Sequence, residues 1–248
     1  MKSPDAEKWH QAMQEEYLMH LENRTWEIVK LPPGKKAIAS GWVFRVKRNP
    51  DGSVERYKGR LVAKGFSQRP GQDYTEVFAP ASRSASVRLV LAISAIEDLH
   101  LHSVDISHAF IHGELEEEIY MKQPEGFEEM GPDYVCKLQR SLYGLKQAGR
   151  VWNKKLHSVL TLIGFKRLES DRSIYLYLRD DVKIIMPIHV DDLTLASNSQ
   201  SAIDHVVKEL AQHFKLRDLG PTTFLLGIEI TRDRSNHSMS ISQHQYIV

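Results

Sequence analysis

The chain lacks the features that mark secreted and membrane proteins. It has one cysteine among 248 residues, Cys136, so no disulfide can form within it, which favours a reducing compartment. Residues 1–13 contain no apolar stretch of the kind that forms a secretory signal. The longest apolar run, residues 87–96, includes Arg88 and Ser94 and is too short to span a bilayer. We therefore expect a soluble intracellular protein, cytoplasmic or nuclear, with no membrane partner.

A large net charge is also absent, because 33 Lys and Arg residues balance 32 Asp and Glu residues. This balance hides two segments of opposite sign. Residues 35–69 hold ten basic residues against two acidic ones, whereas residues 97–133 hold eleven acidic residues against Lys122 alone. Two solvated surfaces would explain this pattern, and so would a polyanion-binding surface together with a cation-binding one. A protein that handles phosphates with a divalent metal would need both.

Hydrophobic periodicity predicts a mixture of helices and strands. Helical spacing occupies residues 4–24, 84–98, 153–165 and 201–214. Strand patterns occupy residues 101–110 and 173–190, and two further segments, 40–66 around the turn signal Asn-Pro-Asp-Gly and 223–244, predict hairpins. This order predicts an α+β fold in which helices pack on one face of an antiparallel sheet.

Two adjacent carboxylates, Asp191 and Asp192, lie between strand-forming residues in the stretch IHVDDLTLAS. A polar turn is one interpretation, since Asp is a favoured turn residue. A metal site is the other, because a cation relieves the repulsion between close carboxylates. Asp105 stands near the end of another predicted strand, and three carboxylates would converge if the strands were neighbours. Such hard oxygen ligands select Mg²⁺ or Mn²⁺ over Zn²⁺.

A basic stretch, YKGRLVAKG at residues 57–65, could complement such a site. Two divalent ions about 4 Å apart can activate a 3′ hydroxyl group and stabilise a leaving pyrophosphate, which then needs a cationic clamp. Lys58 and Arg60 are two residues apart, so on a strand both side chains point to one face. Exposed basic residues on a hairpin are also ordinary solvated charges, and the residue types alone leave both interpretations open.

Four stretches give the chain a resemblance to one family. They are RYKGRLVAKGFSQRPGQDYTEVFAPASR, VDISHAFIHGELEEEIYMKQPEGF, KLQRSLYGLKQAGRVWNKKL and HVDDLTLAS, in that order. With them, the chain closely resembles the reverse transcriptase domain of copia-type LTR retrotransposon Pol polyproteins, from about residue 5 to its end. The resemblance favours the metal site over the polar turn. It implies an RNA-directed DNA polymerase that uses Mg²⁺, with Mn²⁺ as a substitute.

The resemblance also implies a role for individual residues. Asp105, Asp191 and Asp192 match the catalytic metal-binding aspartates, and Ile106 would add its backbone carbonyl group to the metal and nucleotide site. Phe110 matches the steric gate that excludes a ribose 2′ hydroxyl, and the segment that begins with Tyr143 and Gly144 would lie nearest the incoming base pair. The triphosphate clamp would be Lys58 and Arg60. The primer grip would be Phe224, Leu225, Leu226, Gly227, Ile228 and Glu229.

The implied fold is the fingers and palm of a right-hand polymerase, with an antiparallel palm sheet. Residues 1–85 would form the N-terminal helix and fingers, 86–112 the first part of the palm and 113–140 the second part of the fingers. Residues 141–222 would complete the palm and 223–248 form the primer-grip hairpin. The family continues into a thumb and an RNase H domain, so we expect a truncated piece. The implied partners are a template–primer duplex of RNA or DNA, dNTPs and other parts of a Pol polyprotein.

The chain departs from the family pattern at several positions. His189 stands where Tyr is usual, Gly149 where Pro is usual and His108 where Asn is usual. Pro187 removes a hydrogen-bond donor from the strand before the aspartates, which is tolerated only at an edge or a bulge. No departure removes a carboxylate, so the reverse transcriptase hypothesis stands. Two alternatives are an inactive remnant that only binds nucleic acid and a palm-fold cyclase or metal phosphoesterase, the latter disfavoured by SLYGLKQ and Phe110.

Overall fold

The computed structural model describes residues 4–49 and 51–244, and its chain forms two compact units. Unit 1 comprises Met1–Phe78 and Phe110–Trp152, and unit 2 comprises Ala79–Ala109 and Asn153–Val248. The chain passes between units after Phe78, within the short helix η2 (Ala109–His112) and within α3 (Ala148–Ile163). No helix among the described residues is long and apolar enough to cross a membrane.

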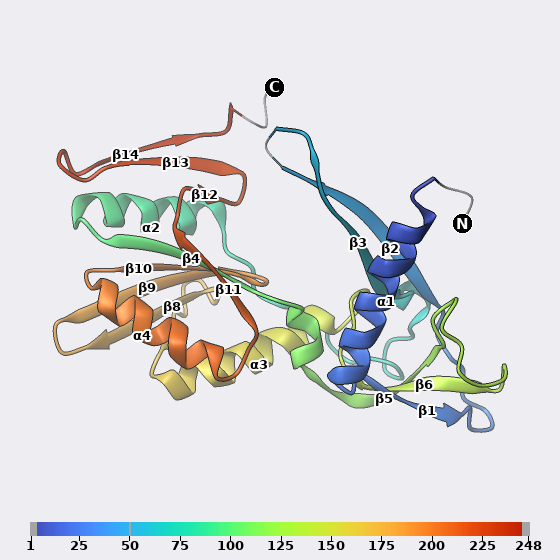
Figure 1. Cartoon of the computed structure of the whole chain (residues 1–248). Coiled ribbons are helices and arrows are strands. Elements are labelled where there is room, and N and C mark those ends of the chain that lie inside the picture. Colours follow the sequence, from blue (N-terminus) through green and yellow to red (C-terminus); the bar gives the residue numbers. More distant parts are fainter. Residues whose placement is uncertain (1–3, 50, 245–248) are drawn as a thin grey trace. The chain divides into compact units, whose positions relative to one another are not determined.

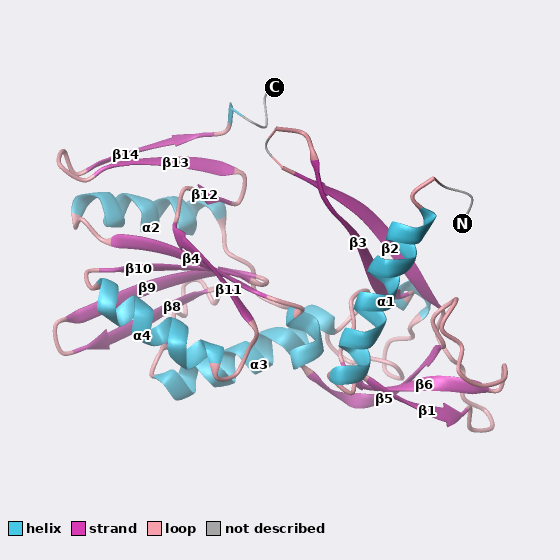
Figure 2. Cartoon of the chain, in the orientation of Figure 1, coloured by secondary structure: helices cyan, strands magenta, loops and turns pink. Residues whose placement is uncertain are grey.

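Unit 1 combines a helix, a two-stranded hairpin and a three-stranded sheet (Figure 2). The helix α1 packs on β3, and its Trp9 ring contacts the rings of Phe44 and Tyr57 at centroid distances of 5.1 and 4.5 Å. The three-stranded sheet has the order β1-β6-β5, and β2 pairs with β3. The elements are α1 (Ala6–Glu22), β1 (Trp26–Lys30), β2 (Ser40–Arg48), β3 (Val54–Ala63), η1 (Gly65–Ser67), β5 (Glu114–Lys122) and β6 (Tyr134–Arg140).

The predicted basic hairpin is confirmed as β2 and β3, although Pro50 of its turn lies outside the described residues. Apolar side chains from several elements form the core of unit 1, including Leu61 of β3 and Met121 of β5, both fully buried. The Cys136 thiol lies in the same core, and its burial raises its pKa to about 12. The hairpin is thus held by its inner face, which leaves the other face for charged residues.

Unit 2 is built around an antiparallel six-stranded sheet in the order β11-β4-β10-β9-β8-β7. A second sheet of three short strands, β12-β13-β14, follows at the end of the chain. The elements, in addition to the second part of α3, are α2 (Ser84–Ile96), β4 (His100–Ile106), β7 (Lys166–Arg167), β8 (Ile174–Arg179), β9 (Val182–His189), β10 (Asp192–Ser197), α4 (Gln200–Ala211), β11 (Leu216–Pro221), β12 (Phe224–Leu225), β13 (Ile228–Asp233) and β14 (Ser238–Ser242).

The α+β class and the antiparallel sheet are confirmed, but the helices cover both faces of the sheet rather than one. Val90 of α2 packs against Ile185 and Ala196 on one face. The helix α4 lies across the opposite face, beside β10 (Figure 1). After Asp192 every residue of β10 is buried, whichever face its side chain points to. A strand buried on both faces reads as a continuous apolar run, which is why the pattern did not reveal the second layer.

Candidate active site

The three candidate aspartates lie on two adjacent central strands of unit 2. Asp192 opens β10 and stands directly across from Asp105 in β4. Asp191 occupies the turn before it, and its backbone carbonyl accepts a hydrogen bond from the Ile106 amide at 3.0 Å. The structure therefore brings Asp105, Ile106, Asp191 and Asp192 to one end of the β4–β10 pair, as the sequence pattern predicts for neighbouring strands.

The turn that carries these aspartates has an unusual backbone. Val190 adopts a positive φ of 61°, a conformation that is a genuine outlier for a β-branched residue. Such strain persists only where the surrounding structure imposes it, and it concentrates at functional sites. Here the imposing structure is the β9–β10 hairpin, in which Asp192 pairs with His189.

Pro187 does not mark an edge strand or a regular bulge, contrary to the expectation from sequence. Its strand, β9, lies between β8 and β10. The β9–β10 pairs are Asp192 with His189, Leu193 with Ile188, Ala196 with Ile185 and Ser197 with Ile184. Pro187, which has no N–H group, thus falls within a gap in the β9–β10 ladder. On its other side, Pro187 is paired with Ile174 of β8.

Like charges crowd this end of the sheet. Burial of the Asp192 carboxyl, together with the nearby Asp191 and Asp105 carboxylates, raises its pKa above the ordinary value. Two basic groups oppose this effect, since His189 and Arg217 lower the same pKa. The Arg217 Nε atom lies 3.6 Å from the Asp105 Oδ2 atom. His189 also carries a buried Nδ1 atom that has no hydrogen-bond partner.

The donor chemistry of this site fits a hard divalent cation, because its side-chain ligands are carboxylate oxygens. Within the described ranges, 4–49 and 51–244, no three His, Cys, Asp or Glu side chains already converge closely enough to hold a metal ion. Mg²⁺ is usually bound through one or two carboxylates together with substrate phosphates, rather than by an all-protein cage. The arrangement therefore suits a metal that arrives with a phosphate-bearing substrate.

The basic hairpin of unit 1 carries Lys58 and Arg60 on one face of β3. On β2, Arg45 lies directly opposite Lys58, and two residues along the same face Lys47 lies opposite Arg56. Like charges opposite each other destabilise a strand pair, so this face is suited to a bound polyanion. Burial of Lys58, with the charges of Arg60 and Arg56 beside it, lowers its pKa below the ordinary lysine value.

Arg60 belongs to a cluster with two other candidate nucleotide-site residues. Its guanidinium lies 5.7 Å from the centroid of the Tyr143 ring, and the centroid of the Phe110 ring lies 5.5 Å from that centroid. Gly144 follows at φ +94°, and a Cβ atom there would collide with the Ala63 carbonyl oxygen at the end of β3. The Ala63 amide donates to the Tyr143 carbonyl at 2.8 Å, so β3 and the SLYGLKQ segment are held together.

Two glutamines that the sequence pattern did not single out secure the same junction. Gln68 and Gln147 are both buried, and the Gln68 Nε2 atom donates to the Gln147 Oε1 atom at 3.1 Å. Gln68 Oε1 accepts from the Lys146 amide, and Gln147 Nε2 donates to the Asp73 carbonyl. Gly65 contributes a close backbone approach, since a Cβ atom there would collide with the Gly144 carbonyl oxygen. Gln68 and Gln147 are 79 residues apart in the sequence, and no motif predicted their contact.

The primer-grip candidates form a tight turn in unit 2. Phe224 and Leu225 form β12, Leu226 and Gly227 make the turn with φ values of 49° and 80°, and β13 begins at Ile228. Leu225 and Ile228 are buried against α2, whereas Phe224, Leu226 and Glu229 remain exposed. The exposed side chains of this turn are thus held in place by the two buried residues, Leu225 and Ile228.

Within unit 2 the structure places the aspartates, Ile106 and the residues 224–229. Within unit 1 it places Lys58, Arg60, Phe110, Tyr143 and Gly144. Asp105 and Phe110 are five residues apart but belong to different units. Each unit thus carries a coherent subset of the candidate site residues.

The family described as "Reverse transcriptase (RNA-dependent DNA polymerase)" matches residues 23–248 of the chain. The chain belongs to the reverse transcriptase family. The resemblance inferred from the four stretches is confirmed, since the similar proteins include copia-type Pol polyproteins of plant transposons.

Two of these relatives show the extent of the similarity. The retrovirus-related Pol polyprotein from transposon TNT 1-94 of Nicotiana tabacum is 39% identical over 249 residues, which cover 100% of this chain and 19% of the relative. The corresponding polyprotein from transposon RE1 of Arabidopsis thaliana is 39% identical over 244 residues, 98% of this chain and 16% of the relative. The reverse transcriptase chain thus spans less than a fifth of these polyproteins.

Among solved structures, a foamy viral protease–reverse transcriptase in complex with double-stranded DNA aligns with a TM-score of 0.46. The identity is 13%, and the alignment covers 95% of this chain and 35% of that one. The assignment to the reverse transcriptase family rests on sequence similarity.

Proposed function

We propose that the chain carries the nucleotidyl-transfer centre of an RNA- or DNA-templated DNA polymerase. The observation that carries this proposal is the pairing of Asp192 with Asp105 on adjacent central strands, with Asp191 in the adjoining turn. Oxygen ligands at this position suit two Mg²⁺ ions, with Mn²⁺ as a substitute. Bound there, the metals would activate the primer 3′ hydroxyl group and stabilise the leaving pyrophosphate.

The remaining residues of the proposal act on substrate rather than on metal. The backbone carbonyl of Ile106 would complete the oxygen donor set. Lys58 and Arg60 would hold the triphosphate, because Arg contacts phosphate in a bidentate manner and Lys acts as a point charge. The Tyr143–Phe110 ring pair and Gly144 would bound the sugar and base of the incoming dNTP, with Phe110 excluding a 2′ hydroxyl group. Residues 224–229 would hold the primer terminus.

The partners of this centre would be a template–primer duplex and dNTPs. Other segments of a Pol polyprotein would be linked to it, since the relatives are much longer. A second candidate function, nucleic-acid binding without the reaction, is favoured by one observation of its own. The like-charged pairs of the β2–β3 hairpin suit a polyanion whether or not the aspartates work.

Primer extension tests the proposal. A DNA primer on an RNA template would be offered to the parent and to the double variant Asp191→Asn, Asp192→Asn, first with Mg²⁺ and then with Mn²⁺. The chain supplies a matched control, because Asp180 and Asp181 form a second adjacent pair in the β8–β9 turn of the same sheet. The variant Asp180→Asn, Asp181→Asn removes the same two charges from another hairpin turn.

Extension by the parent and the control, with none by the Asp191, Asp192 variant, would support the metal-dependent polymerase. Absence of extension in all three, with duplex binding retained, would favour the second candidate function. Equal extension by all three would contradict the assignment of Asp191 and Asp192.

A further inference from the structure

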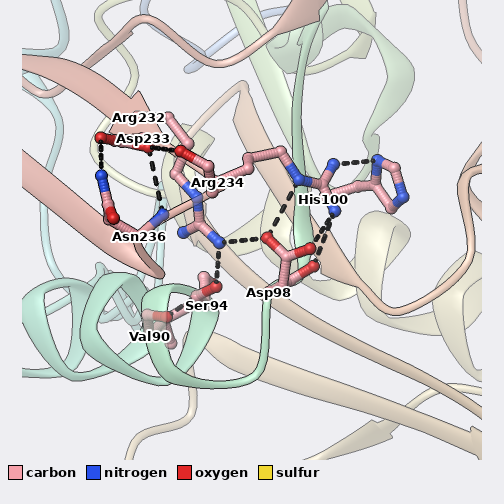
Figure 3. A network of polar contacts seen from close by, with 9 residues as sticks. Val90, Ser94, Asp98, His100, Arg232, Asp233, Arg234 and Asn236 are labelled. Carbon is pink, nitrogen blue, oxygen red and sulfur yellow. Dashed lines mark hydrogen bonds and ion pairs between the residues drawn. The ribbon is translucent and has the colours of Figure 1, made fainter.

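A network of polar contacts joins the C-terminal end of β13 to the connection between α2 and β4 (Figure 3). The Asp98 carboxylate accepts hydrogen bonds from Arg234 Nε at 2.9 Å and Nη2 at 2.8 Å, and from Arg232 Nη2 at 3.0 Å. The Asp98 carbonyl also accepts from Arg234 Nη2. Arg234 Nη1 lies 3.0 Å from His100 Nδ1, and Arg232 Nη2 donates to the Ser94 carbonyl at the end of α2. We call Asp98, Arg232 and Arg234 the latch.

In the latch, two guanidinium groups share one carboxylate. Hydrogen bonds from Arg234 and then Arg232 lower the pKa of the Asp98 carboxyl to about 2. Asp98 has a φ of 52°, so its position depends on a left-handed backbone conformation that aspartate tolerates better than most residues. Arg232 is largely buried, and its Nε and Nη1 atoms have no hydrogen-bond partner. Its Nη2 contacts to Asp98 and the Ser94 carbonyl thus offset only part of the desolvation of this charge.

Apolar side chains also attach the β12–β14 sheet to α2, and we call this group the apolar seat: Val87, Leu91, Leu225, Ile228 and Ile230. Val87 and Leu91 of α2 pack with Leu225, Ile228 and Ile230 of the hairpin. Because these α2 residues precede Ser94, the seat lies toward the start of the helix and the latch lies at its end. The β12–β14 sheet therefore lies along α2, on the side away from the six-stranded sheet (Figure 1).

The latch and the Leu226–Gly227 turn lie at opposite ends of β13. The strand β4 begins just after Asp98 and reaches Asp105 at its other end. The strand β13 begins at the Leu226–Gly227 turn and reaches Arg232 near its end. With a rise of about 3.3 Å per residue, six residues of β13 place the turn roughly 20 Å from the latch. The latch is thus a remote anchor for the turn that the proposed function assigns to the primer.

We propose that Asp98, through Arg232 and Arg234, is a positioning residue that sets the orientation of the primer-contacting turn. This inference rests on the proposed function. An anchor at one end of a strand limits the tilt of its other end, and displacements of about 1 Å in a reacting group can cost 100-fold in rate. Losing the latch would leave the apolar seat in place, so the hairpin would stay attached but would orient the primer less well.

The experiment compares Asp98→Asn and Arg234→Met with the parent in primer extension, duplex binding and amide hydrogen exchange. Asp180→Asn is the matched control, because Asp180 also has a φ of 52° and lies in a turn of the same unit. We expect kcat to fall about tenfold in both latch variants, while KM for dNTP changes little and thermal unfolding shows a folded protein. Exchange of the Ile230 amide, which donates to the Thr223 carbonyl, should accelerate.

The outcomes separate the latch from the proposed function. Unchanged extension in Asp98→Asn, with or without faster exchange, would overturn the positioning role and leave the polymerase assignment intact. A parent that neither extends primers nor binds the duplex would overturn both. A loss of kcat that Asp98→Glu partly restores, with normal activity in Asp180→Asn and every variant folded at the assay temperature, would support the latch, because loss of folded protein could not then explain the change.

Discussion

Asp192 lies across from Asp105 on the paired strands β10 and β4, and Asp191 precedes it in the adjoining turn. Burial and the two neighbouring carboxylates raise its pKa, so its ionised form is disfavoured in the folded chain relative to the unfolded one. Protons are then bound more tightly in the folded state, and the stability of the fold decreases as the pH rises from the ordinary aspartate value through the raised one. Residues kept for chemistry often carry such a cost.

Replacing Asp192 with Asn should therefore raise the thermal unfolding midpoint more at pH 7 than at pH 4, because the destabilisation develops as the pH rises above the ordinary aspartate value. Thermal unfolding at the two pH values would measure this difference. Asp180→Asn, in an exposed turn, should show no such gain, and destabilisation by Asp192→Asn at pH 7 would contradict the crowding argument.

Arg217 is the side chain that partly balances these carboxylates, through its approach to Asp105. Removing its charge should strengthen binding of a divalent cation at the aspartates, since a more negative site attracts cations more strongly. A titration with Mn²⁺ would measure the dissociation constant for Arg217→Gln and the parent. Arg172→Gln, an exposed arginine of the same unit paired with Glu169, is the control of equal charge. Equal affinities in all three would contradict the role of Arg217.

At the scale of elements, the sequence predicted the strongly periodic segments and missed several strands, among them two whose pattern is irregular. The helix α2 and the strands β2, β3, β8 and β9 are where periodicity placed them. The strand β5 was missed because its start, Glu114–Glu118, is rich in glutamate, which is depleted in strands. The strand β11 contains Asp218, Gly220 and Pro221 and pairs with β4 through an irregular register. Tertiary pairing overrode local preference in both cases.

The contacts of the candidate site likewise divide into those that the sequence predicted and those that it did not. The two strands of the aspartates could be expected to be neighbours because each has strand formers around a carboxylate. The Gln68–Gln147 contact and the latch could not be expected, because no motif linked their residues to one another. Such contacts follow from the fold and not from any local pattern.

The contact between β3 and SLYGLKQ gives a prediction at this scale. Gly144→Ala should destabilise unit 1 by about 3 kcal/mol or more, because the new Cβ adds a collision with the Ala63 carbonyl to the strain of a positive φ. Gly34→Ala is the matched control, since Gly34 also has a positive φ, 78°, but open space around it. It should lose only about 1–2 kcal/mol. Chemical denaturation would measure both, and equal losses would contradict the collision.

At the scale of the whole molecule, a net charge of +1 conceals a strongly basic hairpin. Nucleic-acid affinity through such a surface depends on release of counterions, so the affinity falls as salt rises. Removing Lys47 and Arg56 together, both on the exposed face of the β2–β3 pair, should reduce the slope of log affinity against log salt by about 2. The loss should be uniform across duplex sequences.

Duplex binding at several salt concentrations would test this. Arg172→Ala with Arg179→Ala removes two exposed arginines from unit 2 and should leave the slope unchanged. A slope that falls equally in both double variants would mean that the hairpin is not the contact surface.

The way the chain builds unit 2 bears on how such a sequence can be inherited. The strand β4, from the stretch 79–109, is inserted between β11 and β10 of the stretch 153–248. Recombination between two related copies could join residues 79–109 of one copy to residues 153–248 of the other. The contacts along both edges of β4, including the pairing of Asp105 with Asp192, would then form between residues of different origin. Recombinants should therefore survive when the two stretches descend from the same parent, and diverged copies should accumulate compatible changes on both sides of β4 together.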